Sequence, residues 1–563
     1  MNPITTEAHG VLPDVTLETF SKALARTISA LYPDAPVPAI VFEAPRRPEF
    51  GDFATNVALQ LARVAKRSPQ DVATAVLERT FEAEPGLRAV LSEAQPVAGF
   101  INIRLSPACW QSNVARILRE GDGYGRAAPN GTRISLEYGS ANPTGPLVVV
   151  QGRTLSIGQT LADVMRFRGF DVTTEWIIND EGAQMETLAR SLYARYRQTF
   201  DPAFPFPQDG YPAGYLLPIA GLIAGQDGEK WVNAGASEWT PYFAQFGRDR
   251  ILEGQHATAR RFGAMNDLWQ SEKELHESGR VKEDLQRLTE LGLTYESEGA
   301  LFFRAEQFGD DKDRVIVRSD GRTTYYGADI AYHYEKLKRA DKVIDILGPD
   351  HHGYIGRIKG VAEALGYPGH LDVFLSQQIS LMRGDEEVAM SKRAGNIVTL
   401  DDILDEVGVD AARFFFVMLA PESPFKFDLA LAKEQNNANP VYYVQYGHAR
   451  IASVFKNAAV DEPSEPISAE MLAVLSHPTE LALARRLSEL PSTLDNVVKH
   501  YAPHRLTHYA REVASDFHQF YSECKILVED RTQRVARLAL CRATKTVLAT
   551  ALRLTGVSAP ETM

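Results

Sequence analysis

The spacing of apolar residues first predicts a small mixed α/β unit at the N-terminus. Apolar residues recur at helical spacing over residues 15–30 and again over residues 56–65. Residues 51–56 mark a turn, and residues 100–105 have the pattern of a closing strand. We therefore expect a small N-terminal domain over residues 1–108.

Two later stretches have the pattern of strand–helix–strand units. The predicted segments are residues 133–138, 154–167 and 172–178 in the first unit, and residues 342–347, 355–365 and 373–381 in the second. Such units build nucleotide-binding parallel sheets. We expect them to form the two halves of one split Rossmann sheet, separated by an insertion of helix and loop.

From residue 399 onward the apolar spacing is almost wholly helical, and Thr399 can cap a helix that begins at Leu400. The predicted fold is multidomain, α/β plus all-α. A Rossmann-type domain occupies residues 109–425 with an insertion near residues 215–300, and a helical bundle occupies residues 426–563.

The composition places the chain among ordinary globular proteins. Its 563 residues are too many for one core, and 44% hydrophobic with 24% charged residues is a usual balance. We expect a cytoplasmic protein without a membrane segment, because no run of about 18 apolar residues and no signal-peptide pattern is present. The three cysteines lack CxxC spacing, and His351 and His352 have no third ligand at helical spacing, so no metal site is predicted.

The net charge narrows the class of nucleic acid that the chain could bind. The 60 basic and 73 acidic residues give a charge of −13, which argues against indiscriminate binding through an overall basic surface. Such a balance still permits a local basic face for one folded RNA.

A short loop between the second strand–helix–strand unit and the helix at residue 400 has residues suited to phosphate chemistry. Met390, Ser391, Lys392 and Arg393 are followed by Gly395. A lysine on a glycine-containing loop can stabilise charge that develops on a leaving pyrophosphate. We expect Met390, Ser391 and Lys392 to act in catalysis, although a motif this short, taken alone, is usually a solvated turn.

In this position the Met390 loop resembles the KMSKS loop of class I aminoacyl-tRNA synthetases, with Ala389 in place of the family's first lysine. Residues 137–147, followed by Gly152 and Arg153, resemble the arginyl-tRNA synthetase version of the region that carries the family's other signature, HIGH.

Inside that frame the chain departs from the HIGH pattern. Val148 and Gln151 replace the family's histidines, and Val150 replaces its glycine. Gln151 can donate a hydrogen bond to a phosphate but carries no charge, and residue type alone favours the end of a buried strand for residues 148–150. The resemblance makes Gln151 a catalytic contact. It implies an ATP-binding region made of Pro146, Val148, Val150, Gln151, Gly152 and Lys392.

Tyr325 and Asp329 lie in a segment that resembles the arginine pocket of the same family. Four residues apart, they share one face of a helix, and a carboxylate suits the planar fork of a guanidinium. Without the resemblance, Asp329 is equally well explained as a helix-surface carboxylate. The family pattern adds Glu137, Ser140 and Asn142, with Glu137 and Asn142 holding the α-amino group and backbone end of the substrate.

Two further segments resemble tRNA-contacting parts of arginyl-tRNA synthetases. Residues 50–58 resemble the N-terminal domain that touches the tRNA elbow, and residues 439–450 resemble the anticodon-binding domain. Aromatic side chains can stack on splayed bases, although tyrosines at helical spacing are more often core. The candidate RNA contacts are Asp52, Asn56, Tyr442, Tyr446 and Arg450.

The resemblance covers the whole chain. It implies ATP-dependent attachment of L-arginine to tRNA-Arg through arginyl-adenylate, by a monomer, with ATP and Mg²⁺ entering as substrate and no tightly bound cofactor. Such catalysis relies on positioning and phosphate-charge stabilisation. The loss of the HIGH histidines therefore leaves a second hypothesis, a catalytically silent paralogue that binds tRNA, arginine or both as a regulator or carrier.

Overall fold

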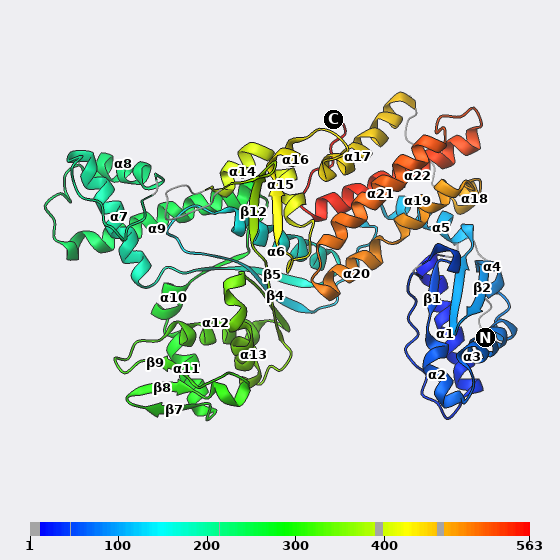
Figure 1. Ribbon diagram of the computed structural model, residues 1–563, viewed down its shortest axis with the longest axis horizontal. Coiled ribbons are helices and arrows are strands. Elements are labelled where there is room, and N and C mark those ends of the chain that lie inside the picture. The colour runs from blue at the N-terminus through cyan, green and yellow to red at the C-terminus, as the bar shows by residue number, and fades with distance from the viewer. Residues whose placement is uncertain (1–11, 46, 213, 389–397, 459–466) are drawn as a thin grey trace.

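The structure is a computed structural model that describes residues 12–45, 47–212, 214–388, 398–458 and 467–563. Figure 1 shows a central sheet, a helical bundle beside it, and a separate N-terminal domain at one end of the molecule. The helices of the insertion extend at the opposite end, so the two ends of the sheet region carry different accessory units.

The N-terminal domain packs helices on a small antiparallel sheet with strand order β1-β3-β2. Its elements are α1 (Pro13–Leu31), β1 (Phe53–Thr55), α2 (Val57–Ala65), α3 (Pro69–Ala83), α4 (Leu87–Val90), β2 (Leu91–Val97) and β3 (Phe100–Leu105). The helices predicted over residues 15–30 and 56–65 and the strand over 100–105 are confirmed. The next helix, α5 (Pro107–Glu120), spans the boundary predicted at residue 108 and packs against the C-terminal bundle.

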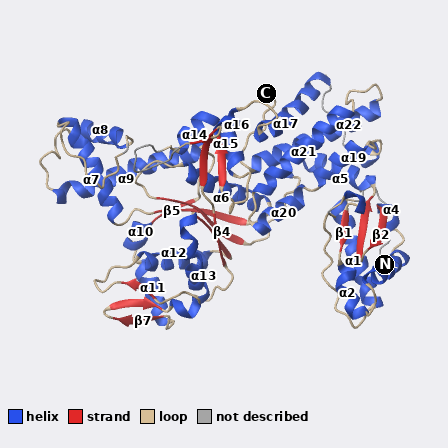
Figure 2. Ribbon diagram, in the orientation of Figure 1, coloured by secondary structure: helices blue, strands red, loops and turns tan. Residues whose placement is uncertain are grey.

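The central sheet is parallel, with strand order β11-β10-β4-β5-β6, and lies at the middle of the molecule (Figure 2). Its strands are β4 (Arg133–Ala141), β5 (Asp171–Ile178), β6 (Leu268–Ser271), β10 (Lys342–Leu347) and β11 (Leu371–Leu375). The connecting helices are α6 (Val149–Phe167) and α13 (Ile355–Ala364). The prediction of one sheet built from two strand–helix–strand units is thus confirmed.

Helix α6 begins earlier than predicted. Val148 is its N-cap, and Val149 and Val150 are its first residues, so the interpretation of residues 148–150 as the end of a buried strand is wrong. The helix places Gly158 against the Tyr138 ring, where an added Cβ would lie 1.9 Å from Tyr138 Cγ. This close approach fixes α6 tightly on β4.

The strand predicted over residues 373–381 is in fact two strands in different sheets. β11 pairs with β10, whereas β12 (Ile379–Arg383) pairs with β13 (Glu386–Glu387) and β14 (Phe425–Asp428). Between them the chain leaves the central sheet, and the buried guanidinium of Arg153 donates to the carbonyl oxygens of Gln377 and Gln378. This contact from a distant helix adds to the backbone hydrogen bonds that Gln377 and Gln378 make with Pro421 and Phe425.

The insertion contains more strand than the sequence suggested. β6 adds the fifth strand to the central sheet, and β7 (Thr294–Ser297), β8 (Ala300–Phe303) and β9 (Arg314–Val317) form a small sheet of their own. The helices of this region are α7 (Ala183–Phe200), α8 (Leu216–Asp227), α9 (Ala236–Arg261), α10 (Glu272–Glu277), α11 (Arg280–Glu290) and α12 (Tyr325–Arg339). Helices α7 to α9 enclose a separate apolar core.

The C-terminal part is helical, as predicted. Its longer helices are α17 (Pro440–Ala458), α19 (Pro478–Ser488), α20 (Leu490–His500), α21 (His504–Glu523) and α22 (Arg531–Leu554). The shorter ones are α14 (Leu400–Val407), α15 (Val409–Phe416), α16 (Leu429–Lys433) and α18 (Ala469–Leu472). Thr399 caps α14 by accepting a hydrogen bond from the Asp402 N–H, which confirms the predicted cap. Among the described residues, no helix is long and apolar enough to span a membrane.

Candidate functional site

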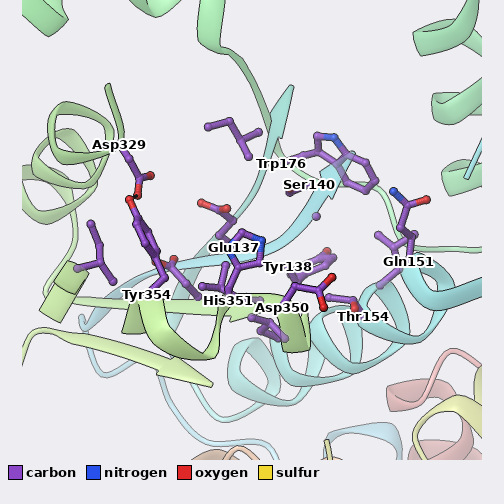
Figure 3. A pocket seen from close by; sticks show the side chains of 18 of the residues that line it. Glu137, Tyr138, Ser140, Gln151, Thr154, Trp176, Asp329, Asp350, His351 and Tyr354 are labelled. Carbon is purple, nitrogen blue, oxygen red and sulfur yellow. Dashed lines mark hydrogen bonds between the residues drawn. The ribbon is translucent and has the colours of Figure 1, made fainter. Parts of the chain in front are cut away.

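A cavity of about 240 Å³ opens at the carboxyl ends of the adjacent strands β4 and β10. The helix after β4 and the helix after β10 leave the sheet in different directions, so this edge is the topological switch point, where open α/β sheets bind ligands. Figure 3 shows Glu137, Gln151, Asp329, Asp350 and Tyr354 around this cavity.

One end of the cavity carries the predicted guanidinium-binding pair. Tyr325 and Asp329 both line it from the first turns of α12. Tyr325 is 59% exposed, whereas the Asp329 side chain is 13% exposed. The Tyr354 hydroxyl donates a hydrogen bond to the Asp329 carboxylate, and His333 Nδ1 lies 3.2 Å from it. The cavity thus has a nearly buried carboxylate held in place at one end.

Glu137 faces the same cavity from β4 and is 6% exposed. Its Oε2 accepts a hydrogen bond of 2.9 Å from Nζ of Lys336. Burial raises the pKa of the Glu137 carboxyl, and the Lys336 ammonium opposes that rise. Ser140 lies three residues further along β4, where the strand becomes exposed.

The N-terminus of α6 reaches the cavity at the position of the HIGH resemblance. Oε1 of Gln151 accepts a hydrogen bond of 2.8 Å from the backbone N–H of Val148. In a capping box, the N-cap side chain would also accept a hydrogen bond from the backbone N–H of residue 151. Val148 has no polar side-chain atom, so that second hydrogen bond is missing. Because the oxygen of Gln151 is used in this way, its amide nitrogen is the group left to donate to a ligand. Val150 lines the cavity beside it.

A second, wider cavity of about 880 Å³ adjoins the first and shares Ser140 and Gln151 with it. Asn142, Pro146 and Val148 line this second cavity. Its opposite wall consists of insertion residues between α7 and α8, namely Phe206, Tyr211 and Tyr215 among others. The predicted arginine and ATP residues therefore divide between two connected spaces.

Two residues of the HIGH-like segment point away from both cavities. An added Cβ on Gly152 would lie 2.6 Å from Leu400 Cδ1, so this glycine allows α6 to pack against α14. Arg153 is fully buried, and its Nη2 donates to the carbonyl oxygen of Ala420 at 3.0 Å. Burial lowers the pKa of Arg153 to about 10. Arg153 is thus a structural residue and does not replace a HIGH histidine. The predicted Met390, Ser391 and Lys392 lie outside the described residues.

Among the predicted RNA contacts, Asp52 occupies a structural position. It is 3% exposed, pairs with Arg485 of α19 at 2.7 Å and accepts a hydrogen bond from the Leu105 N–H at 2.8 Å. This carboxylate joins the N-terminal domain to the bundle and is too deeply buried to contact RNA, so the structure makes Asp52 a structural residue. Asn56, by contrast, is exposed at the N-terminus of α2.

The aromatic residues predicted on α17 form a half-buried cluster. The rings of Tyr442 and Tyr446 stack at 6.0 Å between centroids. The Arg450 guanidinium lies 4.9 Å from the Tyr446 ring centroid and 4.6 Å from that of Tyr521 on α21. This arrangement brings the three predicted residues together and adds Tyr521, which is 39% exposed.

The sequence interpretation missed Glu272, at the start of α10. Burial, together with the carboxylates of Asp180, Glu181 and Asp329, raises the pKa of Glu272 to about 7. Asp329 is the smallest of these contributions, and Glu272 lies outside the lining of the cavity. Glu272 follows a short strand and lies among other acidic residues, and this pattern is too common in sequences to identify one functional residue.

Comparisons with known proteins agree with this arrangement. Residues 18–105 match the model of the arginyl tRNA synthetase N terminal domain, residues 257–417 that of the tRNA synthetases class I (R) catalytic domain, and residues 444–563 that of the DALR anticodon binding domain. The solved Thermus thermophilus arginyl-tRNA synthetase is 21% identical, with a TM-score of 0.75 over 97% of this chain and 100% of that chain, which supports the fold.

Two curated relatives extend the likeness in sequence. An arginine–tRNA ligase from Syntrophotalea carbinolica is 42% identical over 94% of this chain and 95% of its own length. One from Heliobacterium modesticaldum is 40% identical over 97% of this chain and 100% of its own length. The chain therefore belongs to the arginyl-tRNA synthetase family of class I aminoacyl-tRNA synthetases.

Proposed function

We propose that this protein attaches L-arginine to tRNA-Arg in two steps. A carboxylate oxygen of arginine attacks the α-phosphorus of ATP, and the bond to pyrophosphate breaks to leave arginyl-adenylate. A ribose hydroxyl of the 3′-terminal adenosine of tRNA then attacks the arginyl carbonyl carbon, its proton is released, and AMP leaves. Membership of the arginyl-tRNA synthetase family supports this activity.

The observation that carries the proposal is a cavity lined by a buried carboxylate, Glu137, and a nearly buried one, Asp329. Asp329 receives the guanidinium, with Tyr325 beside it, and Glu137 receives the α-amino group. Ser140 and Asn142 hold the carboxylate end. Arginine carries a positive group at both ends, so two carboxylates select it over amino acids with one positive group.

The N-terminus of α6 takes the nucleotide phosphates. Helix N-termini attract anions through their unpaired N–H groups and the helix dipole, and the amide nitrogen of Gln151 adds one donor. Pro146, Val148 and Val150 border this region. Gly152 contributes by letting the helix pack closely. The Met390, Ser391 and Lys392 loop supplies positive charge to the leaving pyrophosphate. Mg²⁺ enters with ATP as part of the substrate, and we assign it no protein ligand.

The second cavity receives the 3′-terminal adenosine. It adjoins the first at Ser140 and Gln151, and its aromatic wall of Phe206, Tyr211 and Tyr215 suits a stacked base. In this placement the ribose of the terminal adenosine lies beside the carbonyl group of arginyl-adenylate, and the tRNA end does not have to cross the space that holds the arginine side chain.

Residues 1–108 and 426–563 bind the remainder of the tRNA, and residues 109–425 carry the chemistry. Asn56 contacts the elbow, whereas Tyr442, Tyr446 and Arg450 contact the anticodon arm. A cytoplasmic monomer fits this role, because each part of the tRNA is met by one chain.

Amino-acid specificity tests this proposal. ATP–pyrophosphate exchange is measured with arginine, citrulline or lysine, with and without tRNA-Arg. Arginine is expected to support exchange, and citrulline, whose side chain is an uncharged isostere, is expected to fail because Asp329 then has no guanidinium to pair with. Equal exchange with arginine and citrulline would contradict the assignment of Asp329.

A further inference from the structure

Three buried carboxylates lie side by side across the central sheet. In the register of the strands, Asp345 of β10 pairs with Glu137 of β4, and Glu137 pairs with Glu175 of β5. They are 1%, 6% and 0% exposed, respectively. Neighbouring strands are about 4.8 Å apart, so three acidic side chains on one face would repel each other strongly without cations.

Helix α12 crosses this row and supplies a cation at every third residue. His333 Nε2 lies 2.8 Å from Asp345 Oδ2. The Lys336 ammonium donates to both Asp345 and Glu137, and Arg339 donates to Glu175. Because residues three apart share a helix face, the spacing of His333, Lys336 and Arg339 matches the three-strand row.

Lys336 is the centre of this arrangement, and its ammonium is completely buried. A buried ammonium is costly unless it is paired and hydrogen-bonded. Burial alone would lower the pKa of Lys336, but the carboxylates of Asp345, Glu137 and Glu175 outweigh burial and raise it. The reciprocal effect lowers the pKa of Asp345 to about 2 against the opposing effect of burial. Lys336 therefore remains charged at neutral pH.

A chain of contacts with alternating charges connects Asp329 to Glu137, and both residues line the cavity. From Asp329 the contacts run to His333, Asp345, Lys336 and Glu137 in turn. Burial would lower the pKa of His333, but Asp329 and Asp345 raise it to about 10, so the imidazole is protonated.

We propose that Lys336 is a positioning residue for the α-amino group of the amino-acid substrate. Because the ammonium holds Oε2 of Glu137, Oε1 is the oxygen left to meet the substrate ammonium. Figure 3 shows the Glu137 side chain at the cavity. The Lys336 ammonium also opposes the burial that raises the pKa of the Glu137 carboxyl. This role deepens the proposed function and rests on the assignment of Glu137 to the α-amino group.

If Lys336 only stabilised the fold, its loss would weaken the binding of every ligand of the cavity alike. If Lys336 positions the α-amino group, its loss weakens only the binding of ligands that carry that group. The probes are L-arginine and 5-guanidinopentanoic acid, which is arginine without its α-amino group. The KM of arginine and the inhibition constant of the des-amino compound are both measured in tRNA charging. The variant is Lys336→Met, and Arg339→Met is the matched control, because Arg339 pairs with Glu175 away from the cavity.

Lys336→Met is expected to raise the KM of arginine about 10- to 100-fold, the usual effect of losing a charge-assisted contact. The inhibition constant of the des-amino compound and the KM of ATP are expected to change little, and Lys336→Arg to recover most of the loss. Arg339→Met is expected to change both ligands' constants equally or not at all. An equal rise of both constants in Lys336→Met would overturn the proposal.

A second variant keeps the test available if Lys336→Met does not fold. Asp345→Asn preserves the shape of the side chain but removes the carboxylate that competes with Glu137 for the Lys336 ammonium. The ammonium then pairs with Glu137 alone, and this stronger pairing weakens the attraction of Glu137 for the substrate ammonium. Arginine KM is again expected to rise while the des-amino constant does not, and equal changes again overturn the proposal. If the unchanged protein charges no tRNA, the proposed function fails instead, and this outcome is distinct from either result.

Discussion

Oε1 of Gln151 accepts a hydrogen bond from the backbone N–H of Val148, 2.8 Å away, and this contact shapes the site where the family's histidines are absent. It satisfies one N–H at the start of α6 and turns the Gln151 amide nitrogen toward ligands. The remaining N–H groups of the first turn are the phosphate donors on which the proposed mechanism depends.

Substitutions of Gln151 separate its structural from its catalytic contribution. Gln151→Glu keeps an acceptor for the Val148 N–H but replaces the donor with an anion. We expect unchanged thermal stability and charging reduced about 10²-fold, because a phosphate donor is lost. Gln151→Ala is expected to lose about 1 kcal/mol of stability as well. Thermal unfolding and charging rates measure the two effects, and full activity of Gln151→Glu would contradict the phosphate contact.

Asp329 is expected to determine affinity for the guanidinium. Asp329→Asn keeps the shape of the side chain, but its loss of charge weakens a charge-assisted pair worth about 1.5–3 kcal/mol. The KM of arginine is therefore expected to rise about 10- to 150-fold. Asp350→Asn is the matched control, because Asp350 is an exposed carboxylate that lines the same cavity. Equal effects of the two substitutions would show that only the overall charge of the cavity matters.

Glu272 is expected to make arginine binding depend on pH. With its pKa raised to about 7, Glu272 is ionised above that pH and neutral below it. Lowering the pH from 8 to 6 reduces the ionised fraction about tenfold, so the KM of arginine is expected to rise by up to that factor. Glu272→Gln is expected to remove this part of the pH profile, whereas Glu274→Gln, an exposed position on the same helix, should retain it.

The ion pair between Asp52 and Arg485 is expected to stabilise the contact between the N-terminal domain and the bundle. Arg485 is 32% exposed and Asp52 is buried, so losing the charge of Asp52 is expected to cost about 1–3 kcal/mol. Asp52→Asn should therefore lower the urea midpoint while the KM of arginine stays the same. Glu82→Gln, which breaks an exposed pair with Arg79, is the control and should change stability little. A large loss of tRNA affinity with unchanged stability would restore Asp52 as an RNA contact.

Much of the fold was predictable because it follows from local patterns. The strand of β10 and the cap at Thr399 were placed correctly from apolar spacing and residue type alone. The break between β11 and β12 was not, because residues 373–381 are predicted as one strand although Ser376, Gln377 and Gln378 interrupt its apolar residues. The segment at the break is held by hydrogen bonds from Arg153, more than 200 residues earlier in the chain, and with Pro421 and Phe425, and no local pattern encodes those contacts.

The candidate site shows the same division. The spacing of Tyr325 and Asp329 predicted their shared face, and both line the cavity. The row of Asp345, Glu137 and Glu175 requires the register of three strands, which the sequence does not specify. The sequence signal for this row is one acidic residue inside each of three strands. Burying a carboxylate is costly, so this pattern indicates that cations are buried nearby.

Single-turnover charging tests the central claim most directly. Purified protein in excess over tRNA-Arg is mixed with ATP, Mg²⁺ and labelled arginine, and arginyl-tRNA is followed in time. The account predicts complete charging of tRNA-Arg, loss of charging in Lys392→Ala, and no charging of a non-cognate tRNA. Tight binding of tRNA-Arg with neither adenylate nor arginyl-tRNA formed would contradict it.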